Sequence, residues 1–120
     1  PYTSSAASDV YKRQLQTHPL NQEAPAVFSQ HLDVPSGKTT KLKIRVSYHP
    51  HGDWQLRVLV GDEVLDDRII SYANVSDEWL ELEYDLTKYA GQHAELSIEN
   101  SANDWKNEFG YWSYIKIISE

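Results

Sequence analysis

The stretch Thr40-Lys41-Leu42-Lys43-Ile44-Arg45-Val46-Ser47-Tyr48-His49 decides the fold class of this 120-residue chain. From Leu42 to Tyr48 every second residue is apolar or aromatic, and cationic or polar residues stand between them. Because successive side chains of a β-strand point to opposite faces, this pattern predicts a strand with one buried face and one face toward water. Such strands are typical of antiparallel sheets.

The same period of two recurs along most of the chain, with turn residues between the runs. We expect further strands at residues 27–34, 54–60, 63–65, 68–72, 79–86, 93–100 and 111–119. Gly61-Asp62 predicts a hairpin turn, and the run from Asp85 to Gly91 predicts one helical turn that Asp85 caps and Gly91 ends. Seven or eight short strands with one helical turn predict an all-β protein built as a two-sheet sandwich.

Residues 4–14 read Ser-Ser-Ala-Ala-Ser-Asp-Val-Tyr-Lys-Arg-Gln, which matches the in-frame translation of a sequencing-library adapter. We therefore expect the chain to be an open reading frame from metagenomic DNA, with residues 1–14 an artefact and residues 15–120 a single domain. We also expect the natural gene to continue upstream and to encode a further module. The alternative, a signal-peptide remnant, lacks the apolar core of about 7–15 residues that such a segment needs.

Charge and composition restrict the classes of partner. The chain has no cysteine, which excludes disulfides and thiolate metal sites. Its formal net charge is −7; residues 1–14 carry +1 (Lys12 and Arg13 against Asp9), which leaves −8 for residues 15–120. Nucleic acids and anionic membranes are disfavoured as partners, because phosphates are bound by clustered Lys and Arg. No apolar run is long enough to span a membrane.

Three stretches in the second half carry a family pattern: Trp79 with Asp85-Leu86-Thr87-Lys88-Tyr89-Ala90-Gly91-Gln92, then Ala94-Glu95-Leu96-Ser97-Ile98, then Tyr111-Trp112-Ser113-Tyr114-Ile115-Lys116-Ile117. They resemble the closing half of galactose-binding-like jelly-roll domains, where a strand ending in D-L-[ST]-x-[YL]-A-G precedes an apolar strand, a loop and a final aromatic strand. The resemblance implies an antiparallel jelly-roll sandwich over nearly all of residues 15–120.

Within this superfamily, the chain looks most like accessory domains at the C-termini of large secreted bacterial proteins, many of which act on polysaccharides. The resemblance therefore implies a non-catalytic, secreted or cell-surface module that binds a polysaccharide or oligosaccharide beside an upstream module of the same polypeptide. The motif is a structural corner and does not specify a sugar, because the ligand loops vary between members.

We expect the sugar-binding surface to combine an aromatic set with a polar set: Trp105, Trp112 and Tyr114 with Asn103, Asp104 and Glu108. The alternation places Trp112 and Tyr114 on the outward face of the last strand, next to the loop that carries Trp105. Sugars have flat C–H faces that pack on indole rings, and hydroxyls that need fixed polar partners. In the competing interpretation, Trp112 is capped by the loop and closes the end of the sandwich. The alternation predicts that Trp54 is buried, and it does not decide whether Trp79 lies in the core or on the surface.

Metal binding is a further hypothesis. His49 and His51, with Asp53 nearby, are weak candidates for a transition-metal site, because Pro50 and the expected turn disturb the spacing of the two imidazoles. A structural calcium ion is more plausible, since loop carboxylates supply hard oxygen ligands. The candidates for that ion are Asp53, Asp66, Asp67, Asp104 and Glu108. The alternative is that these acids are simply solvated.

The sequence contains no pattern typical of catalysis. It has no G-x-S-x-G motif and no phosphate-binding glycine loop, and Glu81, Glu83 and Asp85 alternate with apolar residues as the solvent face of a strand does. A non-catalytic carbohydrate-binding module is therefore favoured. Two alternatives stay open: a structural or protein-interaction sandwich domain, and a small metalloprotein that uses His49 and His51 to oxidise polysaccharide.

Overall fold

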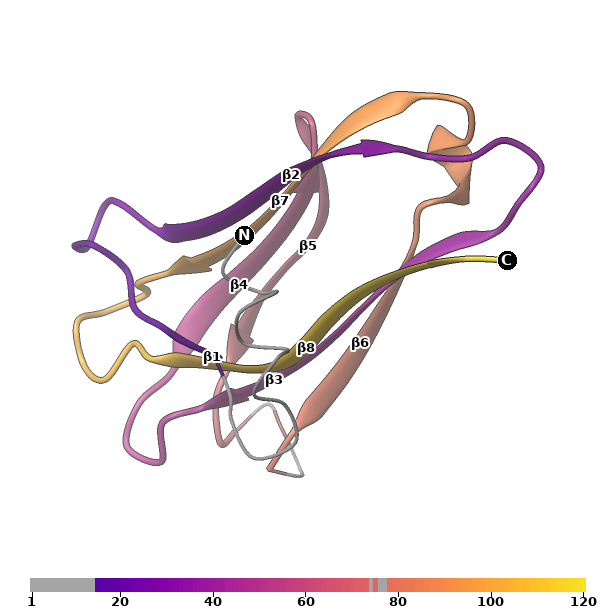
Figure 1. Cartoon of the computed structure of the whole chain (residues 1–120). Helices are drawn as coiled ribbons and strands as arrows, with labels where there is room; N and C mark the ends of the chain where they lie inside the picture. Colours follow the sequence, from indigo (N-terminus) through magenta and orange to yellow (C-terminus); the bar gives the residue numbers. More distant parts are fainter. Residues whose placement is uncertain (1–14, 74, 76–77) are drawn as a thin grey trace.

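Two four-stranded antiparallel sheets form the protein in a computed structural model that describes residues 15–73, 75 and 78–120 (Figure 1). The first sheet has the order β1 (Leu15–Thr17), β8 (Gly110–Ser119), β3 (Thr40–Tyr48) and β6 (Leu80–Asp85). The second has the order β2 (Ala26–Asp33), β7 (His93–Ser101), β4 (Trp54–Val60) and β5 (Glu63–Ile70). This is an eight-stranded jelly roll. The predicted all-β antiparallel sandwich is confirmed, whereas the expected adapter segment, residues 1–14, lies outside the described residues.

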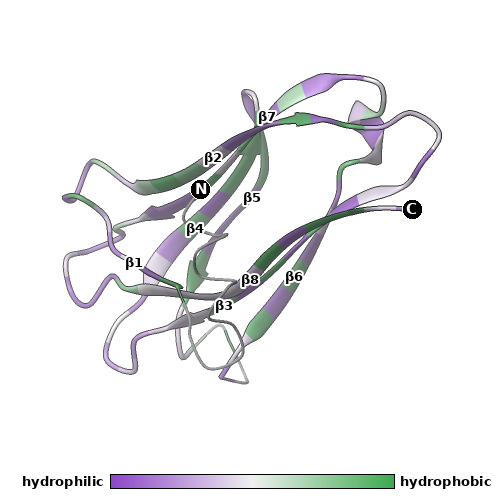
Figure 2. Ribbon diagram, in the orientation of Figure 1, coloured by the Kyte–Doolittle hydropathy of each residue, from purple (hydrophilic) through white to green (hydrophobic). Residues whose placement is uncertain are grey.

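The core lies between the two sheets, where the inward residues of β3 and β4 meet. Leu42, Ile44 and Val46 of β3 are fully buried, as are Trp54 and Leu56 of β4. Figure 2 shows hydrophobic and hydrophilic segments alternating along β4 and β6, as expected for strands with one face on the core. The predicted burial of Trp54 is thus confirmed.

One 3-10 turn, η2 (Thr87–Tyr89), follows β6 and matches the predicted helical turn. The Asp85 carboxylate accepts a hydrogen bond from the Thr87 backbone N–H at 2.8 Å, although the residue directly before the turn is Leu86. Gly91 follows the turn with φ +79°, a left-handed conformation that glycine adopts without strain. No helix in the described part of the chain is long and apolar enough to cross a membrane.

β5 differs from its prediction, because residues 63–70 form one strand instead of two. The expected break falls at Asp66 and Asp67, where two adjacent acids resemble a turn. Asp66 remains in the strand because its carboxylate pairs with Arg68 Nε at 2.8 Å and accepts the hydroxyl hydrogen of Tyr84. The three-residue β1 was not predicted, because it is too short to show a period of two.

β8 carries a bulge that the sequence pattern did not reveal. Arg45 pairs with Tyr114 and Val46 with Trp112, which leaves Ser113 without a partner in β3. An extra residue of this kind reverses the alternation on one side of it. The predicted outward position of Trp112 is therefore wrong: the side chain is 5% exposed and its ring centroid lies 5.1 Å from that of Trp54.

Four connections gather at one end of the sandwich, which we call the loop end. They are the β1–β2, β3–β4, β5–β6 and β7–β8 connections, whose described residues are 18–25, 49–53, 71–73 with 75 and 78–79, and 102–109. The register brings them together, since Gly110 pairs with both Thr17 and Tyr48, while Trp54 pairs with Ile70. Side chains far apart in the sequence can therefore meet at this end.

Candidate functional site

A groove of about 450 Å³ opens at the loop end, beside the end of β3 and the start of β8. We call it the aromatic groove, because four aromatic side chains line it: Tyr48, Tyr72, Trp79 and Tyr111. Ser47, Pro50 and Glu78 complete the lining. Its volume lies within the range of about 300–1,000 Å³ that is typical of small-molecule sites.

The strands fix three of the four aromatic residues. Tyr48 is the last residue of β3, and Tyr111 lies beside it at the start of β8, paired with Ser47. Trp79 directly precedes β6, and the guanidinium of Arg45 lies 5.1 Å from its ring centroid. Such a cation–π contact holds the indole against the sheet.

The segment before β6 is tied to β3 by polar contacts. The Ser47 hydroxyl donates a hydrogen bond to the backbone carbonyl of Glu78, and the Ser47 carbonyl accepts one from the buried Trp54 indole N–H at 2.9 Å. Tyr72, from the same β5–β6 connection, is 81% exposed. The groove thus has a rigid floor on β3 and β8 and an open aromatic side.

The three aromatic residues predicted from the sequence do not form one surface. Trp112 lies in the core, and its indole N–H donates to Thr17 Oγ1 at 2.8 Å. Tyr114 is partly exposed, donates its hydroxyl hydrogen to Glu81 and lies beneath the Lys116 ammonium, 4.3 Å from the ring centroid. Trp105 remains 47% exposed on the β7–β8 loop. A side chain as buried as Trp112 offers no free ring face for stacking.

Trp105 belongs to a separate ring cluster at the loop end. His18 packs edge-on against Trp105, with centroids 4.9 Å apart, and lies 4.8 Å from the ring of Phe109. The ring centroid of His49 lies 5.8 Å from that of Phe109 and 5.9 Å from that of His51. His49 Nδ1 accepts the backbone N–H of His51 at 3.0 Å. This bond occupies one imidazole nitrogen of the weak transition-metal candidate.

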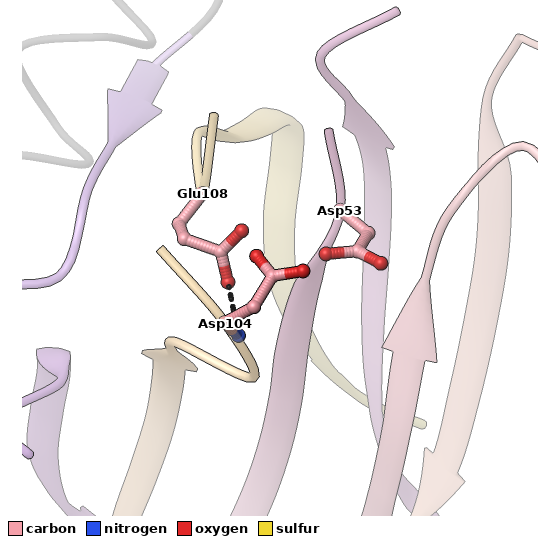
Figure 3. A group of neighbouring side chains, drawn as sticks. All are labelled: Asp53, Asp104 and Glu108. Carbon is pink, nitrogen blue, oxygen red and sulfur yellow. Dashed lines mark hydrogen bonds between the residues drawn. The ribbon is translucent and has the colours of Figure 1, made fainter. Parts of the chain in front are cut away.

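Asp53, the third member of that weak metal candidate, lies instead with two acids of the β7–β8 loop. One carboxylate oxygen from each of Asp53, Asp104 and Glu108 lies within 4.8 Å of the others (Figure 3). Three of the five carboxylates proposed for calcium are therefore brought together. Asp66 and Asp67 are not among them, because they lie on β5 and pair with Arg68 and Arg57.

Glu108 is the centre of this carboxylate cluster. Its side chain is fully buried, and Oε1 accepts the backbone N–H groups of Asn103 at 2.9 Å and Asp104 at 3.4 Å. Burial raises the pKa of Glu108 to about 7; the adjacent Asp104 carboxylate adds to the rise, and the two N–H groups oppose it. Glu108 Oε2 and Asp53 Oδ1 are buried and have no hydrogen-bond partner among the described residues.

Glu108 and its neighbours were predicted to be polar partners of a sugar. Asn103 and Asp104 are exposed and remain available for that role, but the buried Glu108 side chain is not in contact with solvent. Calcium prefers hard oxygen ligands, and two buried oxygens of this cluster, Glu108 Oε2 and Asp53 Oδ1, accept no hydrogen bond from the described residues. The cluster therefore fits a cation better than it fits a sugar hydroxyl.

Comparisons with known proteins agree with this architecture. No protein-family model matches the sequence, and no curated protein matches it. Among solved structures, one described as the EclA C-terminal domain, a sugar-binding protein, is 13% identical over 88% of this chain and 77% of that chain, with a TM-score of 0.65. The chain shares its sandwich fold.

A second solved structure, described as "CBM4 structure and function", is 14% identical over 78% of this chain and 61% of that chain, with a TM-score of 0.51. At these identities the likeness establishes the fold. It agrees with the jelly-roll sandwich that the D-L-[ST]-x-[YL]-A-G motif predicted.

Proposed function

We propose that this domain binds carbohydrate and that the aromatic groove holds the sugar. The observation that carries the proposal is the convergence of Tyr48, Tyr72, Trp79 and Tyr111 on one open groove. Aromatic rings offer flat apolar faces for the C–H faces of a sugar, while the tyrosine hydroxyls and the indole N–H supply hydrogen bonds. Glu78, also exposed in the groove, supplies a carboxylate for sugar hydroxyls.

The fold supports the same function. Both structural neighbours described above carry sugar-related descriptions, one as a sugar-binding protein and one as a CBM4. We further propose that the domain is a non-catalytic accessory module of a larger extracellular protein that acts on polysaccharide. An open groove predicts a modest affinity for each sugar, and tethering to an upstream module multiplies the effect of such an affinity.

Calorimetric titration of the protein with a panel of soluble polysaccharides tests this function. We expect one glycan class to bind saturably. We also expect Trp79→Ala and Tyr72→Ala each to weaken binding by about tenfold or more, because removal of an exposed aromatic stacking partner costs about 1–3 kcal/mol of binding free energy. Trp105→Ala is the matched control, because Trp105 is an exposed indole on a different loop. Loss of binding in Trp105→Ala with full binding in Trp79→Ala would overturn the assignment of the groove.

A further inference from the structure

We propose that Asp53, Asp104 and Glu108 bind one calcium ion, and that this ion positions the aromatic groove by joining the β3–β4 and β7–β8 loops. The first part stands on the carboxylate cluster and on its buried, unpartnered oxygen atoms. The second part rests on the proposed carbohydrate-binding function, because it assigns a regulatory role to a site beside the groove.

No described cationic side chain forms an ion pair with the carboxylate cluster. None of the ion pairs formed by the described residues includes Asp53, Asp104 or Glu108. Carboxylates within 4.8 Å of one another repel when ionised, and burial strengthens that repulsion by lowering the local dielectric constant. A divalent cation removes the repulsion without any change of fold.

The buried oxygen atoms give an independent reason for an ion. Glu108 is fully buried, and its Oε1 is held by backbone N–H groups, while Oε2 lacks any described partner and faces the other two carboxylates (Figure 3). Asp53 Oδ1 is buried and unpartnered in the same way. Buried polar atoms are almost always satisfied by a partner, and an ion satisfies both of these at once.

The donor set selects calcium. All three side chains offer oxygen, whereas zinc prefers nitrogen and sulfur ligands. Ligands that lie about 2.3–2.6 Å from one Ca²⁺ can be up to about 5 Å apart, so oxygens within 4.8 Å of one another can share an ion. Magnesium demands a more regular octahedron and releases its waters reluctantly, which suits a buried protein cage less well.

One of the two loops that supply these ligands contributes a lining residue of the groove, and the other leads directly into the strand that contributes another. Asp53 is three residues after Pro50, and Glu108 is three residues before Tyr111; both Pro50 and Tyr111 line the aromatic groove. An ion held by Asp53 and Glu108 therefore ties the β3–β4 loop, which carries Pro50, to the segment that enters β8 at the floor of the groove.

Direct contacts already bring the loops together. Asn107 Nδ2 donates a hydrogen bond to the His51 carbonyl at 3.3 Å. Gly52 packs so closely on Asn107 that a Cβ atom at Gly52 would overlap the Asn107 carbonyl oxygen. Asn107 itself has φ +52°, a conformation uncommon for residues other than glycine, asparagine and aspartate. An ion at the carboxylate cluster would stabilise this close approach.

Calcium binding can be measured without any sugar. We expect the chelator-treated protein to bind one Ca²⁺ per chain in a calorimetric titration, and its Tm to rise by about 10 °C at about 100 times the Kd. Asp104→Asn, at an exposed position, should fold normally and lose at least about tenfold in calcium affinity, as should Glu108→Gln if it folds. Asp62→Asn, an exposed acid in the β4–β5 turn at the far end, is the matched control and should behave as wild type.

The outcomes separate the two parts of the proposal. No heat and no Tm shift with Ca²⁺, an unchanged response in Asp104→Asn, or an equal response to Mg²⁺ would overturn the calcium site. If calcium binds, we expect chelation to weaken glycan binding by about tenfold, and equal affinity with and without Ca²⁺ would overturn the coupling. Calcium binding without binding of any glycan would leave the cation site standing and refute the proposed function.

Discussion

Trp112 provides the sharpest test of the register of β8. We expect Trp112→Phe to lower the free energy of unfolding by about 2–3 kcal/mol. The loss of the indole N–H bond to Thr17 contributes about 1 kcal/mol, and the space left by the smaller ring beside Trp54 contributes the rest. Trp112→Ala should cost about 3–5 kcal/mol, a large share of the stability of a domain of this size.

Urea unfolding followed by far-ultraviolet circular dichroism measures this effect. With a slope of about 1–3 kcal/mol per molar urea, the midpoint of Trp112→Phe should fall by about 1–2 M. Trp79→Phe is the matched control, because its partly exposed indole lies in the groove and its replacement should shift the midpoint little. An unchanged midpoint in Trp112→Phe, together with lost glycan affinity, would refute the buried position of Trp112 and restore it to a binding surface.

Three further predictions concern other contacts. Gly52→Ala should lower both the Tm and the calcium affinity, because the added methyl group forces the β3–β4 loop away from Asn107; calorimetry that shows wild-type calcium affinity would contradict this. Tyr84→Phe should lower the free energy of unfolding by about 1–2 kcal/mol in urea, since Asp66 loses a hydrogen bond in a half-buried site, and an unchanged midpoint would exclude that contribution. Hydrogen bonds from Lys88 and Tyr89 lower the pKa of Glu63 below 4.5. Wild type should therefore have a larger free energy of unfolding than Glu63→Gln at neutral pH, and this difference should vanish as the pH falls through the lowered pKa. A difference that grows in acid would contradict this prediction.

The fold could be predicted because its strands follow a period of two. In β3, each inward position from Leu42 to Val46 is buried, as the alternation requires. The same rule failed at β8, since the bulge at Ser113 shifts Trp112 to the inner face, and a bulge leaves no mark in a pattern of apolar and polar residues. It failed again at β5, because Asp66 and Asp67 look like a turn in the sequence, whereas the ion pair of Asp66 with Arg68 keeps them within the strand.

The aromatic groove could not be predicted, because its walls meet only through the sheet order. Tyr48 and Tyr111 lie more than sixty positions apart and become neighbours when β3 pairs with β8. Trp79 gave a partial signal, since it stands off the inward phase of its strand, but the alternation alone does not show which surface it faces. Tyr72 carried no functional signal, because the pattern placed it at the end of an expected strand, residues 68–72, whereas the strand ends at Ile70.

The carboxylate cluster could be predicted in part. Its three members were among the five acids that loop position and chemistry suggested, and sequence reasoning could not separate them from Asp66 and Asp67. The jelly-roll connections decide the matter, since the β3–β4 and β7–β8 loops lie at the same end of the sandwich. The complete burial of Glu108 arises from tertiary packing, and the polar sequence of its loop does not predict it.

An NMR titration of the ¹⁵N-labelled protein tests most directly the claim that the aromatic groove binds sugar. It follows the four indole N–H signals of the protein while a glycan that binds it is added. We expect the signal of Trp79 to shift in proportion to saturation, and we expect the signals of Trp105 and of the buried Trp112 to stay in place. A shift confined to Trp105, with Trp79 unmoved, would contradict the assignment of the groove.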